Sequence, residues 1–438
     1  MSLAQQDAPT VVPPGPPSGG FSSTPGSNFG RVLQLLVGVA LITGVFILAG
    51  WGDLLVFIAI LIVIVMLHEL GHFATAKWAG MKVTEYFVGF GPRLWSVRKG
   101  ETEYGVKAIP AGGYVRIIGF TSMEEVAEED EPRAYRNQPF GKRIIVASAG
   151  SAMHLIIAFV LAVILVVGFG KVTNNFTITS LEHWSGVAQT PAQLAGLKTG
   201  DTIVSVNGKT FTSPSQMTDI IKHSTGKQLE LGVERDGRLL HLQATPASGK
   251  GIKVDGTPLG SSGHLGIGIQ QASASVGALA VIPNAFNTMW RVTDQEVAGL
   301  GQTFSPSGLN SVFHQVTNSK AGQSAADNPG SAPRPVSIVG IAHLGAQSEQ
   351  AGIASVLVLL IVINIVFALL NMLPMIPLDG GHVAVAAYEW IRTKKGRPYY
   401  RADITKLLPV AALFIAFLAV FVFAGIYLDI THPLQIPH

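Results

Sequence analysis

The chain has 438 residues, of which 48% are hydrophobic and only 13% are charged. Soluble domains carry roughly 25% charged residues, so much of this chain must face something other than water, and a membrane protein is the first interpretation. The absence of cysteine excludes disulfides, thiolate metal ligands and cysteine nucleophiles. A net charge of +3 gives no reason to expect a nucleic-acid partner.

The first 30 residues are rich in Pro, Gly and Ser and contain no Lys or Arg. This composition predicts a disordered tail at residues 1–30. A cleaved signal peptide begins with basic residues, so we do not interpret this segment as one.

Five apolar segments meet or nearly meet the roughly 20 residues needed to cross a bilayer. We predict transmembrane helices at residues 31–50, 54–78, 144–170, 351–382 and 407–428. The interval from Lys77 to Arg143 carries eleven Lys or Arg residues, both ends included, and the interval from Arg392 to Lys406 carries six. By the positive-inside rule the connecting segments 79–143 and 383–406 are cytoplasmic. This places the amino-terminal tail inside and residues 171–350 and 429–438 outside.

The outer segment has two predicted parts. Residues 171–272 show alternating polar and apolar runs with turn signals such as Asn207-Gly208, and we expect a small β-rich domain there. Within 273–350 we expect an amphipathic helix over 276–300, and then a flexible loop over 318–335, "NSKAGQSAADNPGSAPRP".

The second apolar segment contains "HELGH", residues 68–72. His68 and His72 are four residues apart, so a helix puts both imidazoles on one face, where they can hold one Zn²⁺ with Glu69 beside the open positions. Ionisable groups inside an apolar span are costly and usually functional. The alternative is a pair of histidines that hydrogen-bond across a helix bundle.

A catalytic zinc site needs a third protein ligand, which without cysteine must be His, Asp or Glu. The candidate is Asp379 in "NMLPMIPLDGGH", residues 371–382, where two prolines must break the helix. Broken backbone at membrane depth is tolerated only where protein buries it or a water-filled cavity receives it. His382 ranks second because it lies nearer the aqueous edge. An aspartate that merely caps a helix end is the alternative.

The HExxH string on one span and "NMLPMIPLDG" on a later one resemble the HExxH and NxxPxPxLDG signature of the site-2 protease family of intramembrane zinc metalloproteases. Three further segments are similar to parts of that family. Residues 86–119 resemble its membrane-associated β-hairpin, residues 335–342 the segment before its LDG helix, and residues 192–211 the PDZ domain of the bacterial sigma-E-regulating subgroup. The resemblance covers roughly residues 54–430.

This resemblance implies a polytopic α-helical membrane protein with a membrane-associated β-hairpin and an extracytoplasmic PDZ domain. It implies His68, His72 and Asp379 as zinc ligands and Glu69 as general acid and base. The implied substrate-binding residues are Asn371, Gly89, Gly91, Gly112 and Gly113. Where the family usually has AGPxxN, this chain has "AGSAMH", with Ser151 for proline and His154 for asparagine. His154 could face the substrate or bond to a neighbouring helix.

The implied function is regulated intramembrane proteolysis in a bacterial cell membrane. Substrates would be single-pass membrane proteins such as anti-sigma factors, already trimmed by a first extracytoplasmic cut. The hairpin edge would pair with the unwound substrate, and the PDZ domain would bind a peptide or exclude bulky domains. Alternatives are a catalytically inactive PDZ membrane scaffold, a zinc or ion carrier, and a protease of the prenyl-protein-processing kind, which would want glutamate as third ligand.

Overall fold

A computed structural model describes residues 43–44, 48, 52–120, 124–211, 214–254, 257–327, 332–337, 340–341, 344–345, 352–393 and 400–434. In this part of the chain four helices are long and apolar enough to cross a membrane: Leu55–Trp78, Phe140–Phe169, Ile353–Asn371 and Ile404–Thr431. The predicted tail at 1–30 and all but three residues of the predicted helix at 31–50 lie outside the described residues.

Three of these spans form the membrane bundle, α2 (Gly52–Trp78), α3 (Phe140–Phe169) and α10 (Ile353–Asn371). Small side chains at Ala158 and Ala162 let α3 pack closely against Ile361 and Ile365 of α10. Helices α2 and α3 also approach closely, because a Cβ on Gly71 would lie 2.6 Å from the carbonyl oxygen of Ala149. This crossing lies at the histidine motif.

An antiparallel hairpin, β1 (Val83–Lys99) and β2 (Thr102–Ile117), follows α2 and lies against it. Its pairing register shifts repeatedly between Val83 and Trp95. The Tyr86 hydroxyl donates a hydrogen bond to the carbonyl oxygen of Met66, one turn before Glu69, at 2.8 Å. The hairpin is therefore attached to the helix that carries the histidines. Two short 3-10 turns, η1 (Glu131–Arg133) and η2 (Tyr135–Asn137), lead into α3.

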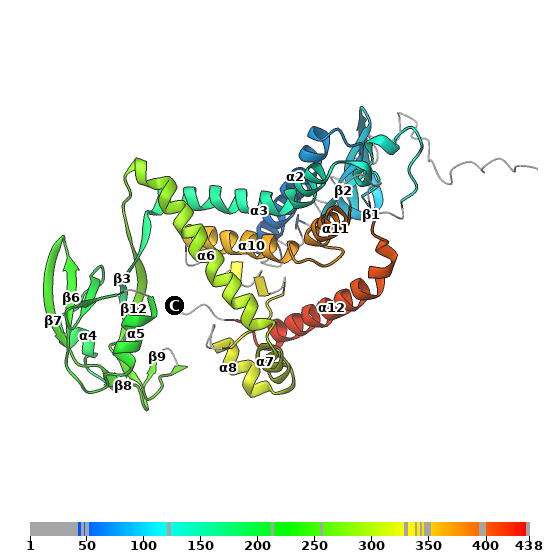
Figure 1. Ribbon diagram of the computed structural model, residues 1–438. Coiled ribbons are helices and arrows are strands. Elements are labelled where there is room, and N and C mark those ends of the chain that lie inside the picture. The colour runs from blue at the N-terminus through cyan, green and yellow to red at the C-terminus, as the bar shows by residue number, and fades with distance from the viewer. Residues whose placement is uncertain are drawn as a thin grey trace, which may run out of the picture.

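The β-rich domain is present at the other end of the molecule (Figure 1). Its antiparallel sheet has the order β12-β3-β4-β6-β7 with β5 paired to β4, and β3 and β12 connect it to the membrane bundle. Asn207 has the positive φ of the predicted hairpin turn. The elements are β3 (Lys171–Leu181), α4 (Pro191–Leu194), β4 (Thr202–Val206), β5 (Lys209–Thr210), α5 (Pro214–Lys222), β6 (Leu229–Arg235), β7 (Arg238–Ala244), β8 (Ala247–Ser248), β9 (Lys253–Val254), β10 (Thr257–Pro258), β11 (Gly263–His264) and β12 (Ile267–Ala274).

Three helices follow this domain, after a 3-10 turn η3 (Ala278–Ala280): α6 (Val281–Thr303), α7 (Pro306–Thr317) and α8 (Ser319–Asp327). Helix α6 is the predicted amphipathic helix, and it packs Ala285 and Val292 into the core formed by α3 and α10. The structure differs from the predicted loop at residues 319–327, which form α8. The side chain of Asn318 accepts hydrogen bonds from the first backbone N–H groups of α8, and Ala325 and Ala326 are buried. The hydrogen bonds of the Asn318 cap and the burial of the two alanines stabilise a helix here despite the polar composition of the segment.

The predicted single span at 351–382 is interrupted. Helix α10 ends at Asn371, and a separate helix α11 (Asp379–Arg392) begins after the turn that holds the two prolines. Helix α11 also occupies part of the segment predicted as a cytoplasmic connection at 383–406. A Cβ on Gly380 would lie 2.2 Å from the carbonyl oxygen of Met372, so the turn folds tightly onto the first residues of α11.

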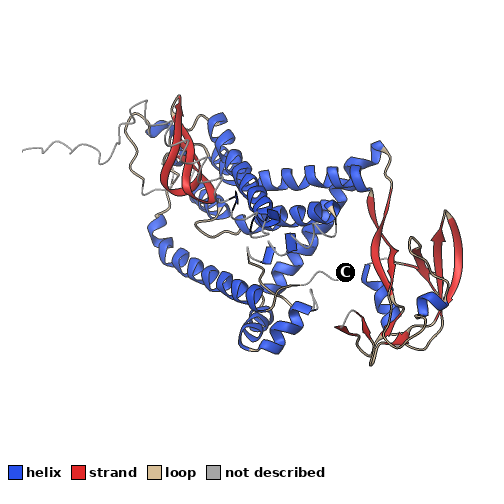
Figure 2. Cartoon of the chain, turned by 180° about the vertical axis from the view of Figure 1, so that it is seen from behind, coloured by secondary structure: helices blue, strands red, loops and turns tan. Residues whose placement is uncertain are grey.

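The last span, α12 (Leu408–Thr431), is preceded by the 3-10 turn η4 (Ile404–Leu407). It makes its main helix contact with α7 (Figure 1). Arg334 and Asp429 form a buried ion pair at 3.0 Å that fixes the end of α12 to the segment before α10. Seen from behind, the strands form two separate groups with the helices between them (Figure 2).

Candidate metal centre

The two histidines of α2 lie side by side in the bundle interior. Their Nε2 atoms are 3.3 Å apart, and the residues are 8% and 5% exposed. The four-residue spacing produces this arrangement because such side chains lie one above the other on one helix face.

Asp379 completes a group of three possible metal ligands. Its Oδ1 lies 3.4 Å from Nε2 of His72, and its Oδ2 lies 3.7 Å from Nε2 of His68. Donors around a tetrahedral zinc ion, at bond lengths of about 2.0–2.1 Å, are about 3.3–3.5 Å apart. In the part of the chain that the structure describes, this is the only group of three such donors. Two imidazole nitrogens and one carboxylate are a donor set that suits zinc.

His382 does not join this group. It lies one turn beyond Asp379 on α11, and its ring packs against the ring of Phe120 with centroids 4.3 Å apart. Of the two candidates for a third ligand, the fold brings Asp379 to the histidine pair.

The orientation of His72 is fixed by α3. Its Nδ1 donates a hydrogen bond to the carbonyl oxygen of Val146 at 2.7 Å. Since Nδ1 then carries the proton, the lone pair of the neutral ring is on Nε2, the atom that faces Asp379 and His68. A backbone acceptor on the far nitrogen is the usual way in which proteins orient a metal-binding histidine.

Helix α3 supports the group at two more points. The Ser151 hydroxyl donates to Oδ2 of Asp379 at 3.3 Å, so one departure from the family motif contacts the carboxylate. Gly150 leaves room for both rings, because a Cβ there would lie 2.3 Å from Cε1 of His68 and 2.4 Å from Nε2 of His72. Only glycine fits at this position without displacing a ring.

Glu69 is partly buried beside the hairpin. A Cβ on Gly113 would lie 3.6 Å from Cγ of Glu69 and 2.4 Å from Sδ of Met66. The strand β2 therefore passes directly over the carboxylate side chain. Gly113 is the one predicted substrate-binding glycine that the structure brings to the motif itself.

The other predicted substrate-binding residues lie at two places. Gly89, Gly91 and Gly112 have φ values of 82°, 83° and 141° in the irregular part of the hairpin, where glycine is favoured. Asn371 is partly buried at the last position of α10, where the chain turns toward Asp379.

His154 bonds to a neighbouring helix. Its Nδ1 lies 3.0 Å from Oδ1 of Asn364 on α10, and both residues are almost fully buried. Sequence reasoning did not single out Asn364 or Gly150. A polar residue within the apolar run "IVINIVF" was the signal that could have identified Asn364. Gly150 gave no comparable signal, because its role depends on another helix.

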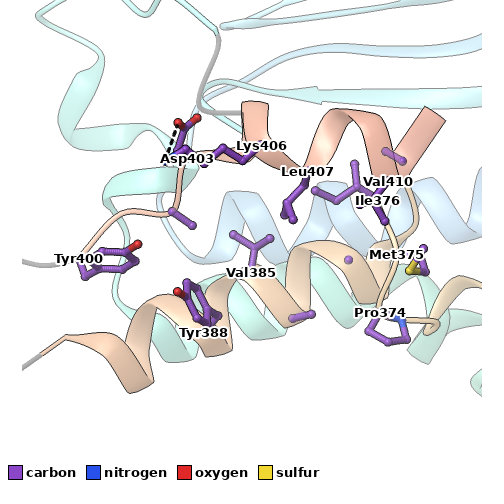
Figure 3. Close-up of a pocket in the computed structure, with 14 residues that line it drawn as sticks. Pro374, Met375, Ile376, Val385, Tyr388, Tyr400, Asp403, Lys406, Leu407 and Val410 are labelled. Carbon is purple, nitrogen blue, oxygen red and sulfur yellow. Dashed lines mark ion pairs between the residues drawn. The ribbon is translucent and has the colours of Figure 1, made fainter. Parts of the chain in front are cut away.

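A cavity of about 430 Å³ lies between α11, the proline turn and the start of α12 (Figure 3). Ile376, Val385 and Val410 contribute apolar walls, and Tyr388 and Tyr400 lie toward one end. The cavity borders the same turn that leads into Asp379.

Comparison with known proteins identifies relatives over most of the chain. Residues 56–418 match the profile of the family described as "Peptidase family M50". "Zinc metalloprotease Rip1" of Mycolicibacterium smegmatis is 31% identical over 419 residues, which are 88% of this chain and 99% of the relative. The protein of the same name from Mycobacterium tuberculosis (strain H37Rv) is 31% identical over 417 residues, 88% of this chain and 98% of the relative.

Proposed function

The chain belongs to peptidase family M50 and is a multi-pass, site-2-type zinc metalloprotease, and we propose that His68, His72 and Asp379 hold its zinc ion. The observation that carries this assignment is the spacing of the donor groups: Nε2 of His72 lies 3.3 Å from Nε2 of His68 and 3.4 Å from Oδ1 of Asp379, and Nε2 of His68 lies 3.7 Å from Oδ2 of Asp379. The carbonyl oxygen of Val146 supports this assignment, because it accepts a hydrogen bond from Nδ1 of His72 and so leaves the lone pair on Nε2, which faces the other donors.

Glu69 is the proposed general base and acid. A zinc ion held by His68, His72 and Asp379 would polarise the scissile carbonyl and lower the pKa of a water molecule. The Glu69 carboxylate takes one proton from the attacking water as its oxygen bonds to the carbonyl carbon. It then delivers that proton to the amide nitrogen as the C–N bond breaks, so the products are a carboxylic acid and an amine, and the acid releases the remaining water proton to the amine or to solvent.

The hairpin is the proposed holder of the substrate. A transmembrane helix hides its peptide bonds, so the substrate must unwind and pair with an exposed strand edge. The positive-φ residues Gly89, Gly91 and Gly112 and the position of Gly113 close to the Glu69 side chain support an edge at this position. Asn371 would hold the substrate backbone from the side of α10.

The substrates we propose are single-pass membrane proteins such as anti-sigma factors, which reach the site from the surrounding lipid bilayer. The cavity between α11 and α12 borders the turn before Asp379 and is consistent with approach from this side. We propose the bacterial cytoplasmic membrane as its location, and the distribution of Lys and Arg favours an orientation in which the hairpin faces the cytoplasm.

The β-rich domain is the proposed PDZ domain on the outer side. A cavity of about 120 Å³ lies between α5 and the segment Gly263–Ile269, with Met217, Ile221 and Leu265 in its lining. A groove between a helix and a strand suits an extended peptide, here the outer stub of a trimmed substrate.

An inactive scaffold or an ion carrier gains no support from the site, since all three donors and Glu69 are retained and assembled. The experiment that tests the protease assignment compares membrane proteomes of cells carrying wild-type protein or Glu69→Gln. Trimmed membrane stubs should accumulate only with Glu69→Gln. Identical stub profiles would contradict the assignment.

A further inference from the structure

The two histidines of the metal centre are supported unequally. Nδ1 of His72 has the carbonyl oxygen of Val146 as its partner, whereas Nδ1 of His68 is buried and has no hydrogen-bond partner among the described residues. A metal-binding histidine normally uses its second nitrogen to fix the plane of the ring. The ring of His68 must therefore be oriented in another way.

The contacts of the His68 ring identify that support. The ring of His154 lies 4.8 Å from it, centroid to centroid, at an interplanar angle of 40°. The ring of His72 meets it edge-on at 4.9 Å. Gly150 closes the space beside both, as the short distances to an added Cβ show. His154 thus contributes the ring from another helix that packs against His68, whose Nε2 also faces Oδ2 of Asp379 at 3.7 Å.

His154 is itself held firmly. The amide nitrogen of Asn364 donates to the carbonyl oxygen of Leu360 at 2.8 Å, so its Oδ1 must be the acceptor that faces His154. Nδ1 of His154 consequently donates. The ring of Phe367 packs edge-on against His154 at 5.5 Å. Asn364 and His154 are 0% and 1% exposed, so neither side chain has room to turn.

We propose that His154, fixed by Asn364, is a positioning residue for the zinc ligand His68. It holds the plane of that ring by contact, in place of the hydrogen bond that Nδ1 of His68 lacks among the residues the structure describes. The inference rests on the proposed function, because it assumes that His68 binds zinc. It assigns a role to a residue at which this chain departs from the family motif.

The test measures zinc affinity of the purified full-length protein by competition with a chelator. His154→Ala should weaken zinc binding by about 10- to 100-fold. His154→Phe in combination with Asn364→Leu keeps a ring against His68 and removes the buried unpaired amide, so it should stay within about fivefold of wild type. Phe159→Ala is the matched control, since Phe159 lies on the same helix but packs toward other residues.

A second readout separates positioning from general loss of stability. With Co²⁺ in place of zinc, the visible absorption bands should shift in His154→Ala and not in Phe159→Ala, while the thermal unfolding midpoints of the metal-free variants fall similarly. If His154→Ala does not fold, Asn364→Ala provides the test and should weaken zinc binding by about tenfold. Unchanged affinity in the folded variant, or equal weakening in Phe159→Ala, would overturn the inference. A wild-type protein without stoichiometric zinc would instead contradict the proposed ligand set.

Discussion

A Cβ added to Gly150 on α3 would lie 2.4 Å from Nε2 of His72 on α2. Two spans therefore meet at the metal centre with no room for even one methyl group. The HELGH motif supplies the imidazoles, but the close approach of α3 determines how they lie.

Gly150→Ala should weaken zinc binding by at least about tenfold, because one of the two rings must leave its position. Gly168→Ala is the matched control in the same helix, since nothing lies within 4 Å of its added Cβ. That control should bind zinc normally and gain up to about 1 kcal/mol from helix propensity. Chelator competition measures the zinc affinity of both variants. Equal affinities would contradict the close approach of α3 to the two histidine rings.

Arg143 should be important for anchoring α11, the helix that begins with Asp379. Its Nη1 lies 2.5 Å from Oε2 of Glu389, and both side chains are almost fully buried. Arg143→Met should cost about 3–5 kcal/mol of stability, because it leaves the Glu389 carboxylate buried without its partner. The measurement is the shift in thermal unfolding of the purified protein.

The double variant Arg143→Met with Glu389→Leu controls for the charge itself. It should recover part of the loss, but not all, since Oε1 of Glu389 also accepts a hydrogen bond from the backbone N–H of Ala402 at 2.7 Å. A double variant less stable than the single one would show that the ion pair is not what Arg143 contributes.

The β-rich domain should lose stability in acid through Asp201. Burial raises the pKa of this carboxyl group, but the hydrogen bonds from Arg235 and from the backbone N–H of Lys198 outweigh burial and lower it overall. A carboxyl group whose pKa is lower in the folded state stabilises the fold above its unfolded pKa of about 3.9. That contribution is lost as the pH falls through the folded pKa.

Asp201→Asn should accordingly destabilise the domain by about 2 kcal/mol at pH 7 and flatten the acid dependence below about pH 4. Asp219→Asn, at an exposed position on α5, should change neither the stability at pH 7 nor the acid dependence. Proteolytic susceptibility of the domain as a function of pH measures both. Parallel acid curves for Asp201→Asn and wild type would rule out Asp201 as the titrating group.

The sequence was sufficient for those features that depend on local patterns. Apolar runs indicated the four described spans, Asn207-Gly208 indicated its turn, and the prolines before Asp379 indicated a break in the helix. The spacing of His68 and His72 predicted their shared face because a helix imposes it.

Features that depend on distant packing could not be predicted in the same way. The acceptor for His72 is the backbone carbonyl of Val146, 74 residues away. Every residue has such a carbonyl, so the amino-acid sequence does not indicate which one accepts the hydrogen bond. The partnership of His154 with Asn364 spans 210 residues and requires the relative placement of two helices. Helix α8 was missed because its polar composition favoured a loop despite the Asn318 cap, and because the burial of Ala325 and Ala326 depends on tertiary packing.

The proposed protease holds one zinc ion with His68, His72 and Asp379 and transfers the proton with Glu69. Two quantities are measured on purified protein. One is the zinc content of Glu69→Gln and of Asp379→Ala, and the other is the cleavage of a single-pass membrane substrate by Glu69→Gln. We predict a full zinc complement with no cleavage for Glu69→Gln, and substantial zinc loss for Asp379→Ala. Cleavage by Glu69→Gln at the wild-type rate, or full zinc in Asp379→Ala, would contradict the account.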